Sequence, residues 1–209
     1  MGRLKDSTAA DLIPEKATLK RLREVARGCT ACDLYKRGTQ TVFGAGSTKA
    51  RLVFVGEQPG NDEDLIGLPF VGPAGKLLDA SLKEAGIDRG DVYVTNVVKH
   101  FKWEARWKRR IHKKPSAGEI HACLPWLEAE IAALRPKLVV CLGATAAQAI
   151  MGGSFRVTKQ RGEVFDSPLG IPILATVHPS SILRAPDDET RRRERGLFVR
   201  DLRAVAAAM

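Results

Sequence analysis

The chain has 209 residues, which is enough for one domain with a sizeable hydrophobic core. Hydrophobic residues make up 44% and charged residues 28%, and no stretch reaches the ~18 uncharged apolar residues that a membrane span needs, so we expect a cytoplasmic protein with no membrane partner. The formal net charge of +10 suits a polyanionic partner such as nucleic acid, although charge alone does not identify one.

Predicted helices and strands alternate along the chain. Residues 1–14 carry no secretory signal and are expected to form a loose arm, and a helix is expected over residues 15–27. Four apolar, β-branched runs without polar alternation predict strands that are buried on both faces: residues 52–55, 92–95, 138–142 and 171–177. Helical patterns follow at residues 73–86, after the capping box of Ser116 and Glu119, after Gly143 and at residues 190–208, with a surface loop at 185–189.

This alternation predicts the fold class. Strands that are separated by helices form a parallel sheet with helices on both faces. We therefore expect a single α/β domain over residues 1–209, with three layers (α/β/α) around a central four-stranded parallel sheet.

Polar side chains follow three of the predicted strands. Ligands bind beyond the carboxyl ends of the strands in open parallel sheets, so side chains at these ends should share one site. These ends carry a carboxylate, two amides, an imidazole and two hydroxyls: Glu57, Gln58, Asn96, His178, Ser180 and Ser181. Each has a simpler interpretation as a turn, a helix cap or a packed side chain, but together they predict an active site.

The four cysteines, Cys29, Cys32, Cys123 and Cys141, favour a metal site. In a cytosolic chain such spacing is more typical of metal ligands than of disulfides. The second pair is too far apart for a zinc ribbon, and four thiolates from separate segments can instead hold a [4Fe–4S] cluster. The spacing alone does not decide between zinc and iron, and two of the cysteines can also be ordinary buried side chains.

The segment 99–114 is the most unusual part of the chain. It contains eight Lys or Arg residues and one acid, interleaved with Phe101, Trp103 and Trp107. A charge run is commonly solvated surface, but aromatic rings within a basic loop fit nucleic acid better, because rings stack on bases while cations follow the phosphates. The segment follows Asn96 and should lie over the rim of the sheet, with His112 inside it. Composition alone leaves His112 as an exposed loop histidine.

Several motifs resemble the family 4 uracil-DNA glycosylases. They are GEQPG at 56–60, GLPFVGPAG at 67–75, NVVK at 96–99 and HPSS at 178–181, together with the order of the cysteines. The resemblance covers residues 29–184, with two departures. Gln58 stands where ordinary members have alanine, and an insertion ends in KRRIH at 108–112. Both departures resemble the UdgX group, whose members excise uracil and become trapped on the DNA through the histidine of that loop.

The resemblance implies a mechanism. Phe70 stacks on the flipped uracil, and Asn96 presents a donor and an acceptor to its N3–H and O4. His178 donates to O2 and stabilises the leaving group, as an oxyanion donor does. His112 then adds to the sugar C1′ with the help of Glu57, which leaves a covalent protein–DNA adduct.

Other assignments also come from the resemblance. Gln58 and Asp64 are expected to bind substrate, and the expected DNA contacts are Arg110, Ser180, Ser181 and Arg184. The four cysteines are expected to hold a [4Fe–4S] cluster. The protein is expected to act as a monomer on uracil-containing DNA, single strands included. Two alternatives are an ordinary multiple-turnover family 4 enzyme, in which His112 only contacts phosphate, and a non-catalytic iron–sulfur protein that binds damaged DNA.

Overall fold

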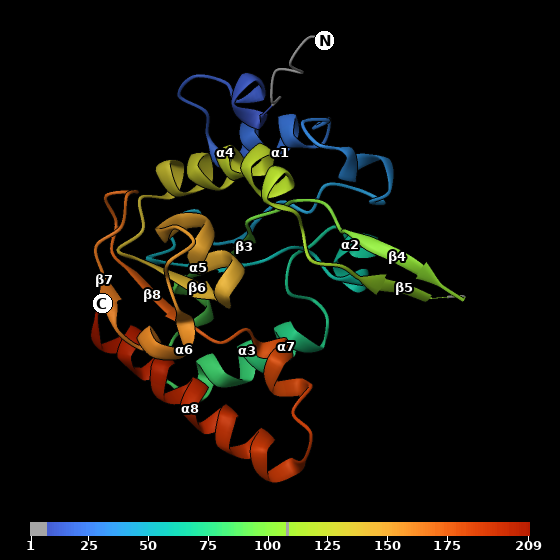
Figure 1. Ribbon diagram of the computed structural model, residues 1–209. Helices are drawn as coiled ribbons and strands as arrows, with labels where there is room; N and C mark the ends of the chain where they lie inside the picture. Colours follow the sequence, from blue (N-terminus) through green and yellow to red (C-terminus); the bar gives the residue numbers. More distant parts are fainter. Residues whose placement is uncertain (1–7, 108) are drawn as a thin grey trace.

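The fold is a three-layer α/β/α arrangement around one mainly parallel sheet (Figure 1). The computed structural model describes residues 8–107 and 109–209. Six strands lie in the order β1-β3-β2-β6-β8-β7. The four central strands are parallel: β2 (Leu52–Gly56), β3 (Val92–Asn96), β6 (Leu138–Leu142) and β8 (Ile173–Thr176). The predicted four-stranded parallel core is confirmed.

Two short edge strands were not predicted. β1 (Ala45–Gly46) pairs antiparallel with β3, and β7 (Val164–Phe165) pairs antiparallel with β8. Two residues are too few to produce an apolar pattern in the sequence, and these edge strands form only because a neighbouring strand pairs with them. The central strands, in contrast, are buried along their whole length, which explains their continuous apolar runs.

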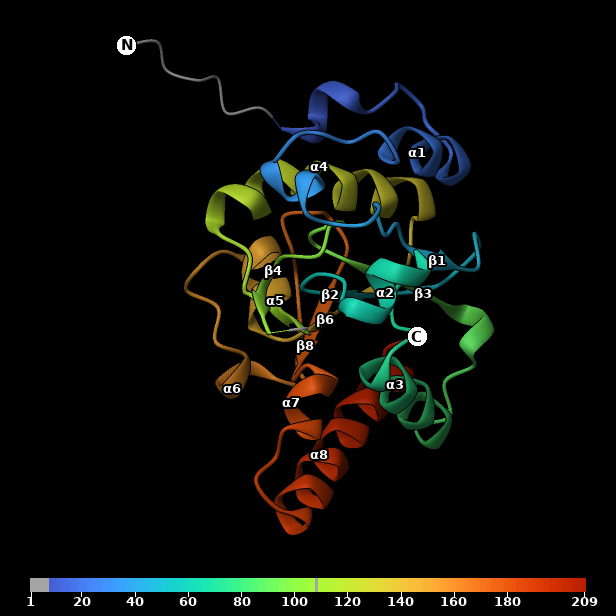
Figure 2. The same ribbon diagram turned by 90° about the vertical axis from the view of Figure 1, so that its right-hand side faces the viewer.

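Helices cover both faces of the sheet (Figures 1 and 2). Alternate strand side chains divide between the faces, with Val53 and Val139 in one hydrophobic cluster and Phe54 and Val140 in the other. The first face is covered by α1 (Leu19–Ala26), α4 (Ala117–Leu134), α5 (Ala144–Met151) and α6 (Val157–Gln160). The second is covered by α3 (Pro73–Glu84), α7 (Pro179–Leu183) and α8 (Asp188–Ala207). No helix in the described ranges is long and apolar enough to cross a membrane.

Side-chain caps set the ends of the helices. The predicted capping box of α4 is confirmed, because Ser116 Oγ accepts from the Glu119 N–H and Glu119 accepts from the Ser116 N–H. Asp187 Oδ1 caps α8 by accepting from the Thr190 N–H at 2.7 Å. The helix therefore begins at Asp188, inside the loop that the sequence predicts at 185–189. Likewise, α1 begins later than predicted, after its cap Thr18.

The start of the described chain packs against the domain. A 3-10 turn, η1 (Ala9–Leu12), is capped by Thr8, and Ala9 is fully buried in the cluster that contains α1 and α4. The predicted loose arm therefore does not extend over this turn, because the Ala9 side chain is part of the core. Residues 1–7 of that prediction lie outside the described residues.

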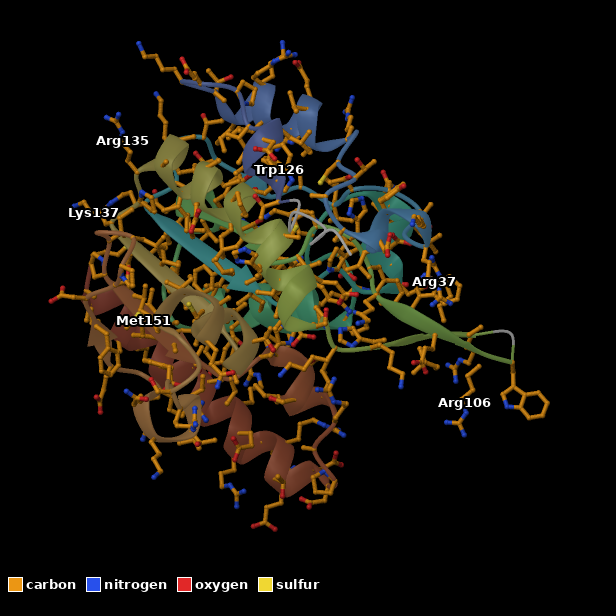
Figure 3. The ribbon with its side chains drawn as sticks, turned by 45° about the horizontal axis from the view of Figure 1, so that its top comes forward. Arg37, Arg106, Trp126, Arg135, Lys137 and Met151 are labelled. Carbon is orange, nitrogen blue, oxygen red and sulfur yellow. The ribbon has the colours of Figure 1, made fainter. Side chains whose placement is uncertain are left out.

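A two-stranded hairpin stands apart from the main sheet. It consists of β4 (Trp103–Arg106) and β5 (Arg109–His112), and Figures 1 and 3 show it projecting from the body of the molecule. Three further short elements complete the described chain: α2 (Asn61–Ile66), η2 (Asp33–Lys36) and η3 (Arg89–Asp91).

Candidate active site at the carboxyl edge of the sheet

The predicted polar residues lie at the carboxyl edge of the parallel sheet. Gly56 at the end of β2 is paired with Asn96 at the end of β3, so Glu57 follows directly beside Asn96. Two further backbone hydrogen bonds extend this pairing, from Val97 N to Gly56 O and from Val98 N to Glu57 O. His178 lies just beyond β8, at the cap of α7. The fold therefore gathers these side chains at one rim, as predicted.

Asn96 and Phe70 meet across Gly56. A Cβ atom on Gly56 would lie 2.4 Å from Asn96 Oδ1 and 2.9 Å from Phe70 Cζ, so only glycine leaves room for both side chains. Phe70 itself has a left-handed backbone, with φ of 58°. Its carbonyl oxygen would lie 1.7 Å from a Cβ on Gly75, so the glycine at 75 is needed for the chain to pass. These two glycines hold an amide and an aromatic ring side by side.

The carboxylate of Glu57 contacts two side chains. Its Oε2 accepts a hydrogen bond from Thr145 Oγ1 at 2.5 Å, and its Oε1 lies 3.5 Å from His112 Nε2. His112 is at the end of β5, so the hairpin brings it over the rim. Thr145, in the first turn of α5, was not predicted. Its importance depends on a contact with a residue 88 positions away, which no local pattern reveals.

The rim environment favours a neutral His112. Partial burial lowers the pKa of His112 below its ordinary value, and the positive charge of Arg184 lowers it further, while the nearby Glu57 carboxylate opposes the shift. A neutral imidazole keeps one nitrogen lone pair, which is the form that can act as a nucleophile.

His178 is held in one tautomer. Its Nδ1 accepts from the Ser180 backbone N–H at 3.1 Å and lies 2.8 Å from Ser180 Oγ. Burial, helped by the charges of Arg184 and His112, lowers the pKa of His178 to about 4, so the ring is neutral at neutral pH. With Nδ1 accepting, the ring proton is on Nε2, which can then donate to a ligand. Its ring lies 6.1 Å from that of Phe70.

Gln58 anchors the base of the hairpin. Its Oε1 accepts from the Lys102 N–H, and its Nε2 donates to the carbonyl oxygens of Lys102 and Lys113. These residues are the two stems on either side of the hairpin. The side chain is buried and its amide is fully used in this way, so the predicted contact of Gln58 with substrate would fall to its backbone and stays a prediction.

A buried ion pair anchors the hairpin a second time. Arg110 donates to Asp64 at 2.6 Å and to Asn61 at 2.9 Å. Asp64 is fully buried and also accepts from the backbone and the hydroxyl of Thr39. The carboxylate of Asp64 is thus enclosed and occupied, and its predicted role in substrate binding, which the backbone could still fill, stays a prediction. The guanidinium of Arg110, predicted to contact DNA, points inward to this pair.

The remaining predicted DNA contacts lie on α7 and just after it. Ser181 Oγ donates to the carbonyl oxygen of His178 at 2.7 Å, and Arg184 is exposed beside both histidines of the rim. The arrangement places hydroxyls and a cation beside the amide, ring and imidazole of the rim. Such a site can bind a flat, hydrogen-bonding ring with a phosphate nearby.

Comparison with known proteins identifies the family. The family model described as the uracil DNA glycosylase superfamily matches residues 43–203. The chain belongs to this superfamily. The type-4 uracil-DNA glycosylase of Thermotoga maritima is 42% identical over 170 residues, which are 81% of this chain and 85% of that protein. The corresponding proteins of Archaeoglobus fulgidus (38% over 172 residues, 79% and 82%) and Pyrobaculum aerophilum (35% over 191 residues, 88% and 91%) are similar to it as well.

Within this uracil-DNA glycosylase superfamily fold, three of the four cysteines (Cys29, Cys123 and Cys141) are buried in one hydrophobic core cluster, and Cys32 packs against it. Cys29 Sγ accepts from Trp126 Nε1 at 3.3 Å, and Cys123 Sγ accepts from the Lys99 N–H at 3.2 Å. Burial raises the pKa of Cys123 to about 12, and Cys29 and Cys32 are near enough to raise it further. No group of three His, Cys, Asp or Glu side chains within residues 8–107 and 109–209 is arranged to hold a single metal ion.

Cys141 comes from the sheet. It lies on β6, paired with Val55 and Ala175, and belongs to the same core cluster as Cys29 and Cys123. Burial raises the pKa of Cys141 to about 12. That the four thiols together hold a metal cluster stays a prediction.

Lys99 is a buried lysine behind the rim, and no role for it was predicted from the sequence. Lys99 Nζ donates to Thr95 Oγ1 and to the carbonyl oxygen of Asn96, each at 2.7 Å, and to Glu130 on α4 at 2.5 Å. Lys99 and Glu130 are both fully buried, so the pair is bound tightly to the end of β3. It fixes the backbone that carries Asn96.

Proposed function

We propose that this chain excises uracil from DNA. The observation that carries the proposal is the rim, where an amide, an aromatic ring and a neutral imidazole meet in a chain of the uracil-DNA glycosylase superfamily. Asn96 pairs with N3–H and O4 of a flipped uracil, and Phe70 stacks on its ring. This assignment of substrate agrees with the names of the type-4 relatives.

The bond that breaks joins C1′ of the sugar to N1 of uracil. Its electron pair leaves with the base, so negative charge develops on the uracil oxygens while C1′ becomes positive. His178 Nε2–H donates to O2 and stabilises this leaving group. Removal of one such donor typically lowers the rate by about 10²- to 10³-fold. The carboxylate of Glu57 offsets the positive charge that develops on the sugar.

We further propose that His112 captures C1′. A ring nitrogen of the neutral imidazole adds its lone pair to C1′, and the resulting imidazolium loses its remaining N–H proton to Glu57 or to solvent. The separation of 3.5 Å between His112 Nε2 and Glu57 Oε1 supports this role. An alkylated imidazole lacks a good leaving group, so the product is a stable protein–DNA adduct and the enzyme acts once. Arg184, Ser180 and Ser181 are the proposed contacts to the DNA phosphates.

We also propose that a [4Fe–4S] cluster holds the N-terminal segment against the core. The four cysteines, Cys29, Cys32, Cys123 and Cys141, would bind it. The N–H groups of Trp126 and Lys99 that point at the sulfurs of Cys29 and Cys123 suit thiolate ligands. When bound, the cluster supplies a rigid crosslink between the N-terminal segment and α4. The residues that act on uracil need no chemistry from it.

A denaturing gel tests the proposal. The protein is mixed with a single-stranded oligonucleotide that contains one uracil, and we expect a protein–DNA band that survives boiling in detergent. His112→Ser should abolish the band and release free abasic sites, because water then reaches C1′. Free abasic sites in excess over wild-type enzyme, without a band, would instead establish an ordinary multiple-turnover glycosylase. Intact uracil in bound DNA would contradict glycosylase activity altogether.

A further inference from the structure

The tip of the hairpin carries an aromatic side chain that the fold does not use. Trp107 follows β4 directly and is 95% exposed, more than any other large hydrophobic side chain in the described parts of the chain. Burying an indole ring stabilises a protein, so a ring left almost wholly in water contributes little to this fold. A ring in this position is available to a ligand.

The other two aromatic residues of this segment are already occupied. Phe101 is buried, and the guanidinium of Arg110 lies 5.5 Å from the centroids of both the Phe101 and Trp103 rings. Trp103 also donates from Nε1 to the carbonyl oxygen of Arg37, whose guanidinium lies 5.2 Å from the same ring. These contacts hold the root of the hairpin to the domain. They leave Trp107 as the ring that is free to stack.

The backbone at the tip gives a second reason. Trp107 has a left-handed backbone, with φ of 56°. Glycine or asparagine adopts this conformation at lower cost in a hairpin turn, and a bulky residue there is unusual. A tryptophan is therefore a poor choice for making the turn.

The charges around the tip are positive. Arg106 and Arg109 form the last pair of the hairpin ladder and are both exposed, and Figure 3 shows Arg106 pointing into solvent at this end. A ring between cations suits nucleic acid, because the ring stacks on a base while the cations contact the phosphates.

We propose that Trp107 stacks on an unpaired base of the substrate strand, with Arg106 and Arg109 on the flanking phosphates. This inference rests on the proposed function, because His112 lies at the other end of the same hairpin. From the Trp103–His112 pair to Trp107 the strand rises ~13 Å at ~3.3 Å per residue. At ~3.4 Å per nucleotide, the stacked base is about three or four nucleotides from the uracil. A base within a duplex is unavailable for this contact, so Trp107 favours single-stranded substrate.

Binding measurements test the proposal. The probe is a single-stranded oligonucleotide with one 2′-fluoro-deoxyuridine, whose glycosidic bond resists cleavage, and the readout is fluorescence anisotropy. Trp107→Asn, which suits the left-handed turn, should weaken binding by roughly 5- to 100-fold, the range for loss of one stacked base. Trp107→Phe should restore most of the affinity. Val164→Ala, at another exposed apolar residue on the edge strand β7, should have no effect.

A scan of the DNA identifies the stacked base. Single nucleotides on either side of the uracil analogue are replaced in turn by a sugar without a base. Replacement at one position should weaken binding of the wild type by the same factor as the Trp107→Asn substitution does. The same replacement should not change the affinity of Trp107→Asn. Equal affinity of Trp107→Asn and wild type for single strands would overturn the proposal, and so would a loss that is as large with duplex DNA.

An excision assay keeps this inference separate from the proposed function. On an ordinary uracil substrate, the concentration of Trp107→Asn that gives half the maximal excision rate should rise by the same factor as its Kd, because Trp107 acts through binding of the strand. A wild type that binds through Trp107 but leaves uracil in place would contradict the proposed function and not the stacking contact.

Discussion

The two oxygens of the Glu57 carboxylate face different partners, and this division determines what the residue can do. Thr145 holds Oε2, so Oε1 remains directed at His112. A carboxylate that is fixed beside an imidazole orients the ring and accepts its proton without first reorganising. Glu57 thus serves the His112 end of the site, while Ser180 performs the orienting role for His178.

The lowered pKa values of both rim histidines predict an acid limit for trapping. His112 must be neutral to offer a lone pair, and burial lowers its pKa below the ordinary value of ~6.5. The pKa of His178 is lowered to about 4. Half-protonation of either ring therefore falls below the ordinary histidine pKa, and the rate of adduct formation should drop to half its maximum only below ~pH 6.5.

Single-turnover adduct formation, followed on denaturing gels from about pH 8 to about pH 5, measures this profile. The excision rate of His112→Ser over the same range is the control, since it reports His178 without His112. A wild-type rate that halves at or above ~pH 6.5 would contradict the assignment of a neutral, pKa-lowered His112.

The sequence predicts some residues of this site much better than others. Glu57, Asn96 and His178 could be predicted because each lies at or just after the carboxyl end of a buried strand, and the topology of a parallel sheet fixes where strand ends lie. Thr145 could not, because an ordinary helix residue becomes important only through a distant partner. The ion pair of Asp64 could not be predicted for the same reason, since only the fold reveals that Arg110 and Thr39 enclose its carboxylate.

The hairpin is the element that distinguishes this site, and the sequence did not predict its strands. Most side chains of β4 and β5 are exposed, so there is no alternation of buried and exposed residues to indicate a sheet. What the sequence did reveal was the mixture of cations and rings. The structure divides that mixture into a root, where Arg110 is bound to the domain, and a tip with Trp107 in solvent.

Gln58 should control whether the reaction ends in a covalent adduct or in a free abasic site. Gln58→Ala removes three hydrogen bonds to the hairpin stems, so His112 is no longer held at Glu57. We expect adduct formation to slow by roughly 10- to 100-fold, a range typical of a misplaced reacting group. Uracil excision should persist, so free abasic sites should accumulate in place of adduct.

Gln148 offers a control. Its amide also donates to a backbone carbonyl, that of Phe155, which does not belong to the hairpin or to its anchors. Gln148→Ala should therefore lower the midpoint of thermal unfolding without changing the ratio of adduct to free abasic sites. The same shift in that ratio for both variants would mean that Gln58 acts only through overall stability.

Helix α4 connects parts of the molecule that lie far apart in the chain. Glu119 in its first turn binds Lys102 at the hairpin stem, and Glu130 binds Lys99 behind Asn96. Trp126, labelled in Figure 3, contacts Cys29 of the N-terminal segment. The sheet could be predicted from its continuous apolar runs, but these cross-links could not, because each joins residues far apart in the chain.

The cysteines give a test of this organisation. If the proposed cluster joins the N-terminal segment to α4, Cys123→Ala should lose iron, sulfide and the brown absorbance of the purified protein, because the thiolates are the ligands of such a cluster. The midpoint of thermal unfolding should also fall, since metal-binding free energy is folding free energy. Trp126 fluorescence should change as well, because the indole donates to Cys29.

Cys141→Ala removes the fourth predicted ligand, a buried thiol on β6 in the same core cluster as Cys29 and Cys123. If all four thiolates hold the cluster, this variant should lose iron and colour as Cys123→Ala does. Val139→Ala, at another buried side chain of β6, is the matched variant, which should unfold at a lower temperature and keep its iron. Retention of iron in Cys141→Ala would remove this residue from the ligands, and retention in Cys123→Ala would contradict the proposed cluster.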